Sequence, residues 1–268
     1  MSHKSVLTKL TGEIIIEKVS YLAETWFSLL SQRNHEKASD ICRDFLKRYG
    51  KEFHLDNLNE DDRNTLLMSL IFSKSLHEFT ELSQITASNK WLKHPETTER
   101  VWFKLCACRE RLQFLSHHYK GEIIEMIFSD LDNLEKDFQS EFGEGIYVSP
   151  GIVSDSRFCS VCGQDFRACS HITGRLYDGN ICSHRSVKPR LNHLAIVEVP
   201  KDFRCRIWSW KIKQNNDGSI TINVCSLTSF SVDDFLQEPY SPLHVLEAEA
   251  TFNHELSQVD RLTSYQFE

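Results

Sequence analysis

Long apolar stretches are missing from this sequence of 268 residues. No run of about 18 uncharged apolar residues occurs, so the sequence predicts no transmembrane helix. The first ten residues carry two lysines but neither the apolar core nor the small-residue cleavage site of a secretory signal. We therefore expect a cytoplasmic protein with no membrane partner.

Sequence motifs of several enzyme classes are missing as well. The chain has no phosphate-binding glycine loop, no nucleophile elbow and no His-Glu-x-x-His motif. It also has no internal repeat and no low-complexity run. Whether the protein is an enzyme stays open at this point, and a non-enzymatic protein is favoured.

The composition is that of a soluble globular protein, with 40% apolar and 26% charged residues. The net charge of -7 is unevenly distributed, because residues 151–213 hold 11 Lys and Arg against 5 Asp and Glu, whereas residues 214–268 hold 1 against 9. Such a basic segment either binds nucleic acid or docks on acidic neighbours in its own chain. The overall negative charge favours docking, because it repels a polyanion.

Helical periodicity runs through residues 12–142 almost without a break. Apolar residues recur every three or four positions, and neither Pro nor Gly interrupts the helix interiors. The second helix is predicted to end near Gly50, the third to begin after Asn59, the fourth at Pro95 and the fifth after Gly121. These signals predict a bundle of five or six helices with short connections.

The character of the sequence changes at residues 142–151, where glycine and proline cluster. Beyond this point strands are predicted over 194–199, 205–212 and 219–225, with a hairpin turn at 215–218. Ser231 marks a predicted helix start.

Four of the nine cysteines lie between Cys159 and Cys182, a clustering that favours reduced thiols around a metal over a disulfide framework. The pattern Cys159-x-x-Cys162-Gly places two thiolates on one cation. Cys169 and His171 alternate along an extended segment and can face the same ion if the chain bends there. Three thiolates and one imidazole form a common closed zinc set.

His171 is the favoured fourth ligand because of its tight spacing from Cys169, but the choice stays open, since Cys182 can replace it and give a four-cysteine site. His184 is a weaker candidate, and a redox dithiol or an iron–sulfur site are further alternatives. A closed set of four ligands favours a structural zinc over a catalytic one, which keeps a position for water.

The same segment resembles a cysteine-rich segment of tailed-phage and prophage proteins, including relatives of prohead maturation proteases. The resemblance covers residues 155–207, about a fifth of the chain, and does not extend to the helical region. It is carried by Cys159, Cys162, Gly163, Cys169, His171, Ile172, Gly174, Tyr177, Asp178, Gly179, Cys182 and the run 197–200. The resemblance implies a zinc-binding β module and a phage-related context, but no protease activity, since no matching Ser and His are found.

Two weaker patterns point toward nucleic acid. Arg111 and His117 lie six residues apart on a predicted helix, which is similar to the Arg and His arrangement of helical HEPN-type ribonucleases. An exposed helix face with His near its C-terminal end is the favoured interpretation. A basic predicted strand is the second pattern, since its two tryptophans can stack bases, although packing in a core is favoured. Its residues are Arg204, Arg206, Trp208, Trp210 and Lys211.

Together these observations predict an α+β protein with a helical domain over 1–143, a zinc-stabilised β module over 144–230 and an acidic segment over 231–268. The leading hypothesis is a phage-related (phage, prophage or antiviral defence) non-enzymatic interaction protein with a structural zinc site, which binds a protein partner or self-associates. The alternative is a ribonuclease or nucleic-acid-processing factor, with a DNA-binding adaptor as a third class.

Overall fold

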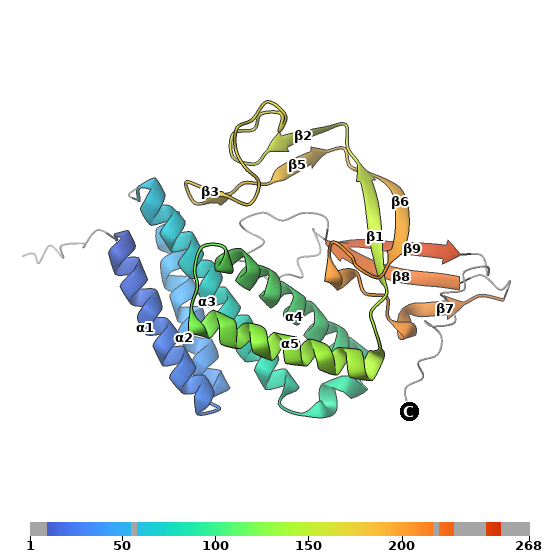
Figure 1. The fold of residues 1–268 in the computed structure, drawn as a ribbon, viewed down its shortest axis with the longest axis horizontal. Coiled ribbons are helices and arrows are strands. Elements are labelled where there is room, and N and C mark those ends of the chain that lie inside the picture. The colour runs from blue at the N-terminus through green and yellow to red at the C-terminus, as the bar shows by residue number, and fades with distance from the viewer. Residues whose placement is uncertain (1–9, 55–57, 217–219, 228–244, 253–268) are drawn as a thin grey trace, which may run out of the picture.

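The computed structural model of the chain describes residues 10–54, 58–216, 220–227 and 245–252 (Figure 1). A helix-rich N-terminal region of five α-helices precedes a smaller region of β-strands. The predicted α+β class, with helices first and strands after, is confirmed. No helix in the described part of the chain is long and apolar enough to cross a membrane.

The helices form where periodicity and end signals predict them. The Asn59 side chain accepts a hydrogen bond from the N–H of Asp62, Pro95 opens its helix and Gly121 caps the last one. The predicted end near Gly50 is wrong, because the helix continues to Phe53, which packs in the core. The elements are α1 (Gly12–Ser31), α2 (His35–Phe53), α3 (Glu60–Thr86), the 3₁₀ helix η1 (Asn89–Lys93), α4 (Pro95–Ser116) and α5 (Glu122–Phe142).

Helix α3 is the centre of the helical domain. Its apolar residues Leu66, Leu67, Leu70 and Ile71 are buried, and polar residues on its other faces are buried as well. Buried ion pairs connect Glu78 of α3 to Arg111 of α4 and to Lys74 one turn earlier. The middle of the helix is therefore covered on all sides, and α1, α2 and α4 pack around it.

The strands form small antiparallel sheets. β1 pairs with β6, β2 with β5, β3 with β4, and β8 lies between β7 and β9. Their bounds are β1 (Tyr147–Val153), β2 (Ser156–Cys159), β3 (Leu176–Tyr177), β4 (Asn180–Ile181), β5 (His184–Val187), β6 (Arg190–Val197), β7 (Ile212–Gln214), β8 (Ile220–Leu227) and β9 (Val245–Phe252).

The strand predictions hold only in part. The first and third predicted strands overlap β6 and β8, and β7 and β8 pair as a hairpin. The prediction over 205–212 is wrong, because this stretch includes the last residue of the 3₁₀ helix η2 (Phe203–Cys205) and the whole of the 3₁₀ helix η3 (Ser209–Lys211). β9, which comes from the predicted acidic segment, pairs with β8 along its whole length. Ser231 and the second half of the 215–218 turn lie outside the described residues.

Candidate metal centre

The first half of the centre is the turn that follows β2. Cys159 is the last residue of this strand, and the N–H of Gly163 donates a hydrogen bond to its carbonyl oxygen (2.9 Å). Gly163 has a φ of 70°, a left-handed conformation that favours glycine. The N–H of Val161 lies 3.4 Å from the Cys159 sulfur. The turn thus brings the thiols of Cys159 and Cys162 together, as the Cys-x-x-Cys-Gly spacing predicts.

The second half comes from Cys169 and His171, in a segment without regular secondary structure. The N–H of His171 donates to the Cys169 sulfur at 3.2 Å, and the His171 Nδ1 lies at the same distance from that sulfur. The Cys169 sulfur is also 3.4 Å from the Cys162 sulfur. The chain therefore bends as required to face both side chains toward the first pair.

The size of this cluster fits a metal ion. The ligand atoms of Cys159, Cys162, Cys169 and His171 all lie within 4.8 Å of one another. Zn–S bonds of about 2.3 Å in a tetrahedron separate two sulfurs by about 3.8 Å. The predicted set of three thiols and one imidazole could hold a metal ion in this arrangement. The identity of the ion stays a prediction.

The alternative ligand Cys182 lies at the edge of the cluster. It follows β4, is buried, and its sulfur is 3.7 Å from the Cys159 sulfur. The structure therefore brings five potential ligands together where a tetrahedral ion needs four. His184 is engaged elsewhere, because its Nε2 hydrogen bonds with Thr173 (2.9 Å) and its ring packs on Phe166.

The thiols of the cluster influence one another's protonation. Burial raises the pKa of Cys159, but N–H groups of Cys162 and Val161 and the neighbouring thiols outweigh this effect and lower the pKa to about 6. Burial raises the pKa of Cys182 to about 11, assisted by the thiol of Cys159. One thiolate thus forms easily at Cys159, and a bound cation would offset the raised pKa of Cys182.

Tyr177 of β3 is a supporting residue that ligand spacing alone did not single out. Its ring packs edge-on against the His171 ring with centroids 4.5 Å apart. Its hydroxyl accepts a hydrogen bond from the N–H of Ile172 at 3.0 Å. These contacts fix the orientation of the imidazole, as outer-shell partners of metal ligands commonly do.

The β3–β4 hairpin attaches the cluster to the helical domain (Figure 1). Asp178 at its tip forms an ion pair with Arg63 of α3 (2.9 Å), and the N–H of Gly179 donates to the Asn64 side chain (2.7 Å). Gly179 has a φ of 71°, and a Cβ there would lie 2.7 Å from Arg63 and 2.8 Å from Phe53. Glycine therefore suits this position best, because any side chain would force Arg63 and Phe53 to shift.

The predicted ribonuclease pair is not brought together. Arg111 is buried in α4 and pairs with Glu78, so its charge is committed to the interior of the helical domain. His117 is exposed beyond the end of α4, and its Nδ1 contacts the carbonyl oxygen of Gln113. Because one side chain faces the core and the other faces solvent, the two do not line a common groove.

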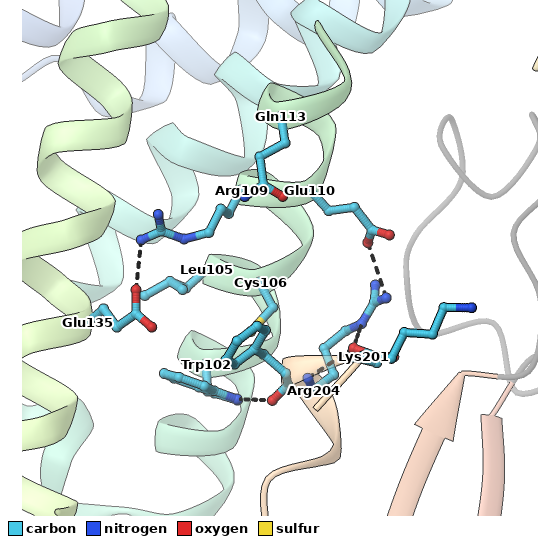
Figure 2. A pocket seen from close by; sticks show the side chains of 11 residues that line it. Trp102, Leu105, Cys106, Arg109, Glu110, Gln113, Glu135, Lys201 and Arg204 are labelled. Carbon is cyan, nitrogen blue, oxygen red and sulfur yellow. Dashed lines mark hydrogen bonds and ion pairs between the residues drawn. The ribbon is translucent and has the colours of Figure 1, made fainter. Parts of the chain in front are cut away.

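The predicted nucleic-acid strand forms the interface between the β-strand region and the helices. Arg204 is buried and pairs with Glu110 of α4 and with Asp202, at the edge of a cavity of about 350 Å³ (Figure 2). Arg206 is buried, and its guanidinium contacts the rings of both Trp102 and Trp208. These positions correct the prediction of a basic nucleic-acid face at this stretch.

The aromatic residues of the same stretch face the helices too. The rings of Trp208 and Trp210 stack at 4.8 Å and both pack on Phe142 of α5. Lys211 forms an ion pair with Glu99 of α4 (3.0 Å). The favoured interpretation of these tryptophans, packing rather than base stacking, is confirmed.

Comparisons with known protein families, with curated proteins and with solved structures find no match to this chain.

Proposed function

We propose that this chain is a non-enzymatic interaction protein in which one structural zinc ion orders residues 154–190 into a module that docks on the helical domain. The observation that carries the proposal is the closed cluster of Cys159, Cys162, Cys169 and His171. Four ligands fill the tetrahedral shell of zinc, and an ion held by such a set orders loops that lack a core of their own.

The acidic residues near the cluster support a structural role for the ion. A catalytic zinc needs an open position and commonly a nearby carboxylate base. Here Arg167 beside Asp165 lowers the pKa of that carboxyl to about 2, so it stays ionised in its ion pair. The other acids of the segment are also in ion pairs, Asp155 with Arg190 and Asp178 with Arg63.

The helical domain offers a surface for a protein partner or for a second copy of the chain. A groove of about 550 Å³ lies between α1, α3 and the start of α5. It is lined mainly by apolar residues, among them Ile16, Val19, Met68, Phe72 and Ile123. An apolar groove of this kind supports association with another polypeptide. Sedimentation of the purified chain over a range of concentrations distinguishes self-association from a heterologous partner.

The phage-related part of the proposal rests on the resemblance of residues 155–207. A cytoplasmic phage, prophage or antiviral defence protein is the context in which we place the chain. Its test is genetic: deletion in the native host is expected to change phage yield, and an unchanged yield across a panel of phages would argue against this context.

Elemental analysis of the purified full chain tests the metal part. We expect about one zinc per chain in the wild type and its loss in Cys162→Ser. Cys106→Ala, which removes a thiol of α4 outside the cluster, is the matched control and is expected to keep the zinc. A wild-type protein purified without any metal, and unable to take up added zinc, would refute the proposal.

Hydrogen exchange then shows what the ion orders. Removal of zinc with a chelator is expected to expose the N–H groups of Gly163 and Cys182, which donate within the loops, while amides of α3 stay protected. The same chelator preloaded with zinc is the control. Equal exchange of the loops with and without metal would show that the ion is not structural.

A further inference from the structure

The surface of the metal-binding loops carries excess positive charge. The three acids of residues 154–190 are each neutralised by an ion pair, and Asp178 is paired to a cation of the helical domain. Four cations of the same segment are exposed and have no ion-pair partner among the described residues. They are Arg157, Arg175, Arg185 and Lys188.

One of these cations belongs to an ordered cluster on one face of the β2–β5 ladder. Arg157 lies opposite Ser186 and Cys159 opposite His184, so Arg157 and His184 share this face. Both pack on Phe166, with the Arg157 guanidinium 5.9 Å and the His184 ring 4.8 Å from its centroid. The aromatic ring thus supports two exposed planar cationic or polar groups side by side.

We propose that this face, centred on Arg157, Phe166 and His184, binds single-stranded nucleic acid. The inference rests on the proposed function, because the ion must order the loops that carry these residues. A guanidinium supported by an aromatic ring offers charge to a phosphate and a flat surface to a base. An acidic peptide would use only the positive charge of Arg157 and would give no role to the flat guanidinium supported by the Phe166 ring.

The geometry favours a single strand over a duplex. The ladder consists of two strands of four residues each, so each spans about 13 Å, which suits a few nucleotides of a flexible chain. Reading a B-DNA major groove uses a helix or a longer β-ribbon. The described residues 154–190 contain no helix to enter such a groove.

The negative charge of the whole chain does not forbid this contact. Interactions between exposed charges are screened beyond about 8 Å at physiological ionic strength, so the local cations dominate at close range. Binding that uses three or four phosphates is expected to weaken with salt, with a log–log slope of about -0.7 per contact for single strands.

The test uses the full chain and fluorescence anisotropy with labelled oligouridylate and oligothymidylate of about 15 nucleotides. We expect binding at low salt, with the slope given above, and a loss of about tenfold or more in Arg157→Ala/His184→Gln. Lys188→Ala, which lies outside the cluster and the ligand set, is expected to reduce both the affinity and the salt slope.

Asp165→Asn/Arg167→Gln is the matched control, because it removes an arginine of the same module together with the carboxylate that neutralises it and so keeps the net charge. We expect its affinity to stay within about twofold of the wild type. Equal binding by the wild type and the double variant, tighter binding to a duplex of the same length, or binding of polyglutamate without any binding of oligonucleotide would each overturn the proposal.

Zinc content is measured on every variant, so that the two proposals fail separately. Absence of zinc from the wild type would contradict the structural metal site itself. Zinc in all proteins combined with no oligonucleotide binding at low salt would leave the metal site standing and remove the nucleic-acid face.

Discussion

The helical domain and the loops of residues 154–190 differ in how much apolar surface they bury. The helical domain buries large side chains such as Trp26, Leu70 and Leu105 around α3. In contrast, only three residues between 154 and 190 are buried, and none of them has a large apolar side chain. They are Cys159, Gly179 and Cys182. A segment that buries so little cannot offset its conformational entropy by burial alone. The comparison teaches that one region folds on a core and the other lacks one, which is why we propose that an ion and a few anchored contacts order it.

The largest expected effect comes from the core of the helical domain. Trp26 is fully buried and its indole N–H donates to the Thr80 hydroxyl at 2.7 Å. Trp26→Ala is expected to lower the free energy of unfolding by about 3–5 kcal/mol through lost burial and a cavity. Ile172→Ala, at a half-exposed position of the loops, is the control and is expected to change it by less than about 0.5 kcal/mol. Urea unfolding followed by helical circular dichroism measures the change in stability of both variants. Similar losses in the two would contradict the division into a region with a core and a region without one.

The next effect concerns the fourth ligand. If His171 completes the set, His171→Ala lowers zinc affinity strongly, whereas Cys182→Ser removes only a neighbouring thiol and lowers it by about 10-fold to 100-fold at most. Competition with a chromogenic chelator measures both affinities. The absorption spectrum of the cobalt-substituted protein also counts the thiolate ligands, because the intensity of its charge-transfer bands rises with the number of bound sulfurs. Loss of one such ligand in Cys182→Ser would assign the four-cysteine set instead.

The sequence predicted the features that depend on local spacing. Helix ends followed from Asn59 and Pro95, and the ligand cluster followed from the positions of Cys159, Cys162, Cys169 and His171, because turns of a few residues bring such side chains together. The predictions that failed concern contacts between residues that are distant in the chain. Trp208 and Trp210 are spaced like two residues on one face of a strand. The chain instead forms a 3₁₀ turn there, and the two rings stack on each other. The spacing alone does not identify the helix on which they pack.

The same limit explains two other findings. From the sequence alone, Arg204 is expected to be a surface cation, and only the fold shows that Glu110 lies beside it. The Asp178–Arg63 ion pair joins residues 115 positions apart, so no local pattern predicts that the β3–β4 hairpin docks on α3. Sequence therefore predicted the cluster of potential ligands but not its attachment to the helical domain.

A smaller effect is expected where the loops meet the helical domain. Gly179→Ala adds a Cβ that would collide with Arg63 and Phe53, in a left-handed conformation that already disfavours alanine. We expect a loss of about 1–2 kcal/mol in stability, detected as faster hydrogen exchange in β3 and β4. Gly174→Ala has the same sign of φ (83°) but open space around its Cβ, so it isolates the backbone cost. Equal losses in both variants would show that the docking contact contributes nothing.

The smallest expected effect tests whether surface ion pairs hold the loops together. Asp155 and Arg190 pair at 3.0 Å across the start of β2 and β6, and both side chains are exposed, 48% and 70% respectively. Because water and salt screen such a pair, Arg190→Gln is expected to change the free energy of unfolding by less than about 0.5 kcal/mol and to leave zinc affinity within about twofold.

Arg204→Gln, at an almost fully buried side chain paired with Glu110 and Asp202, is expected to cost several times more because it leaves those carboxylates without their partner. Thermal unfolding of both variants with zinc present measures the contrast. A large loss in Arg190→Gln would mean that exposed pairs, rather than the ion, hold these loops.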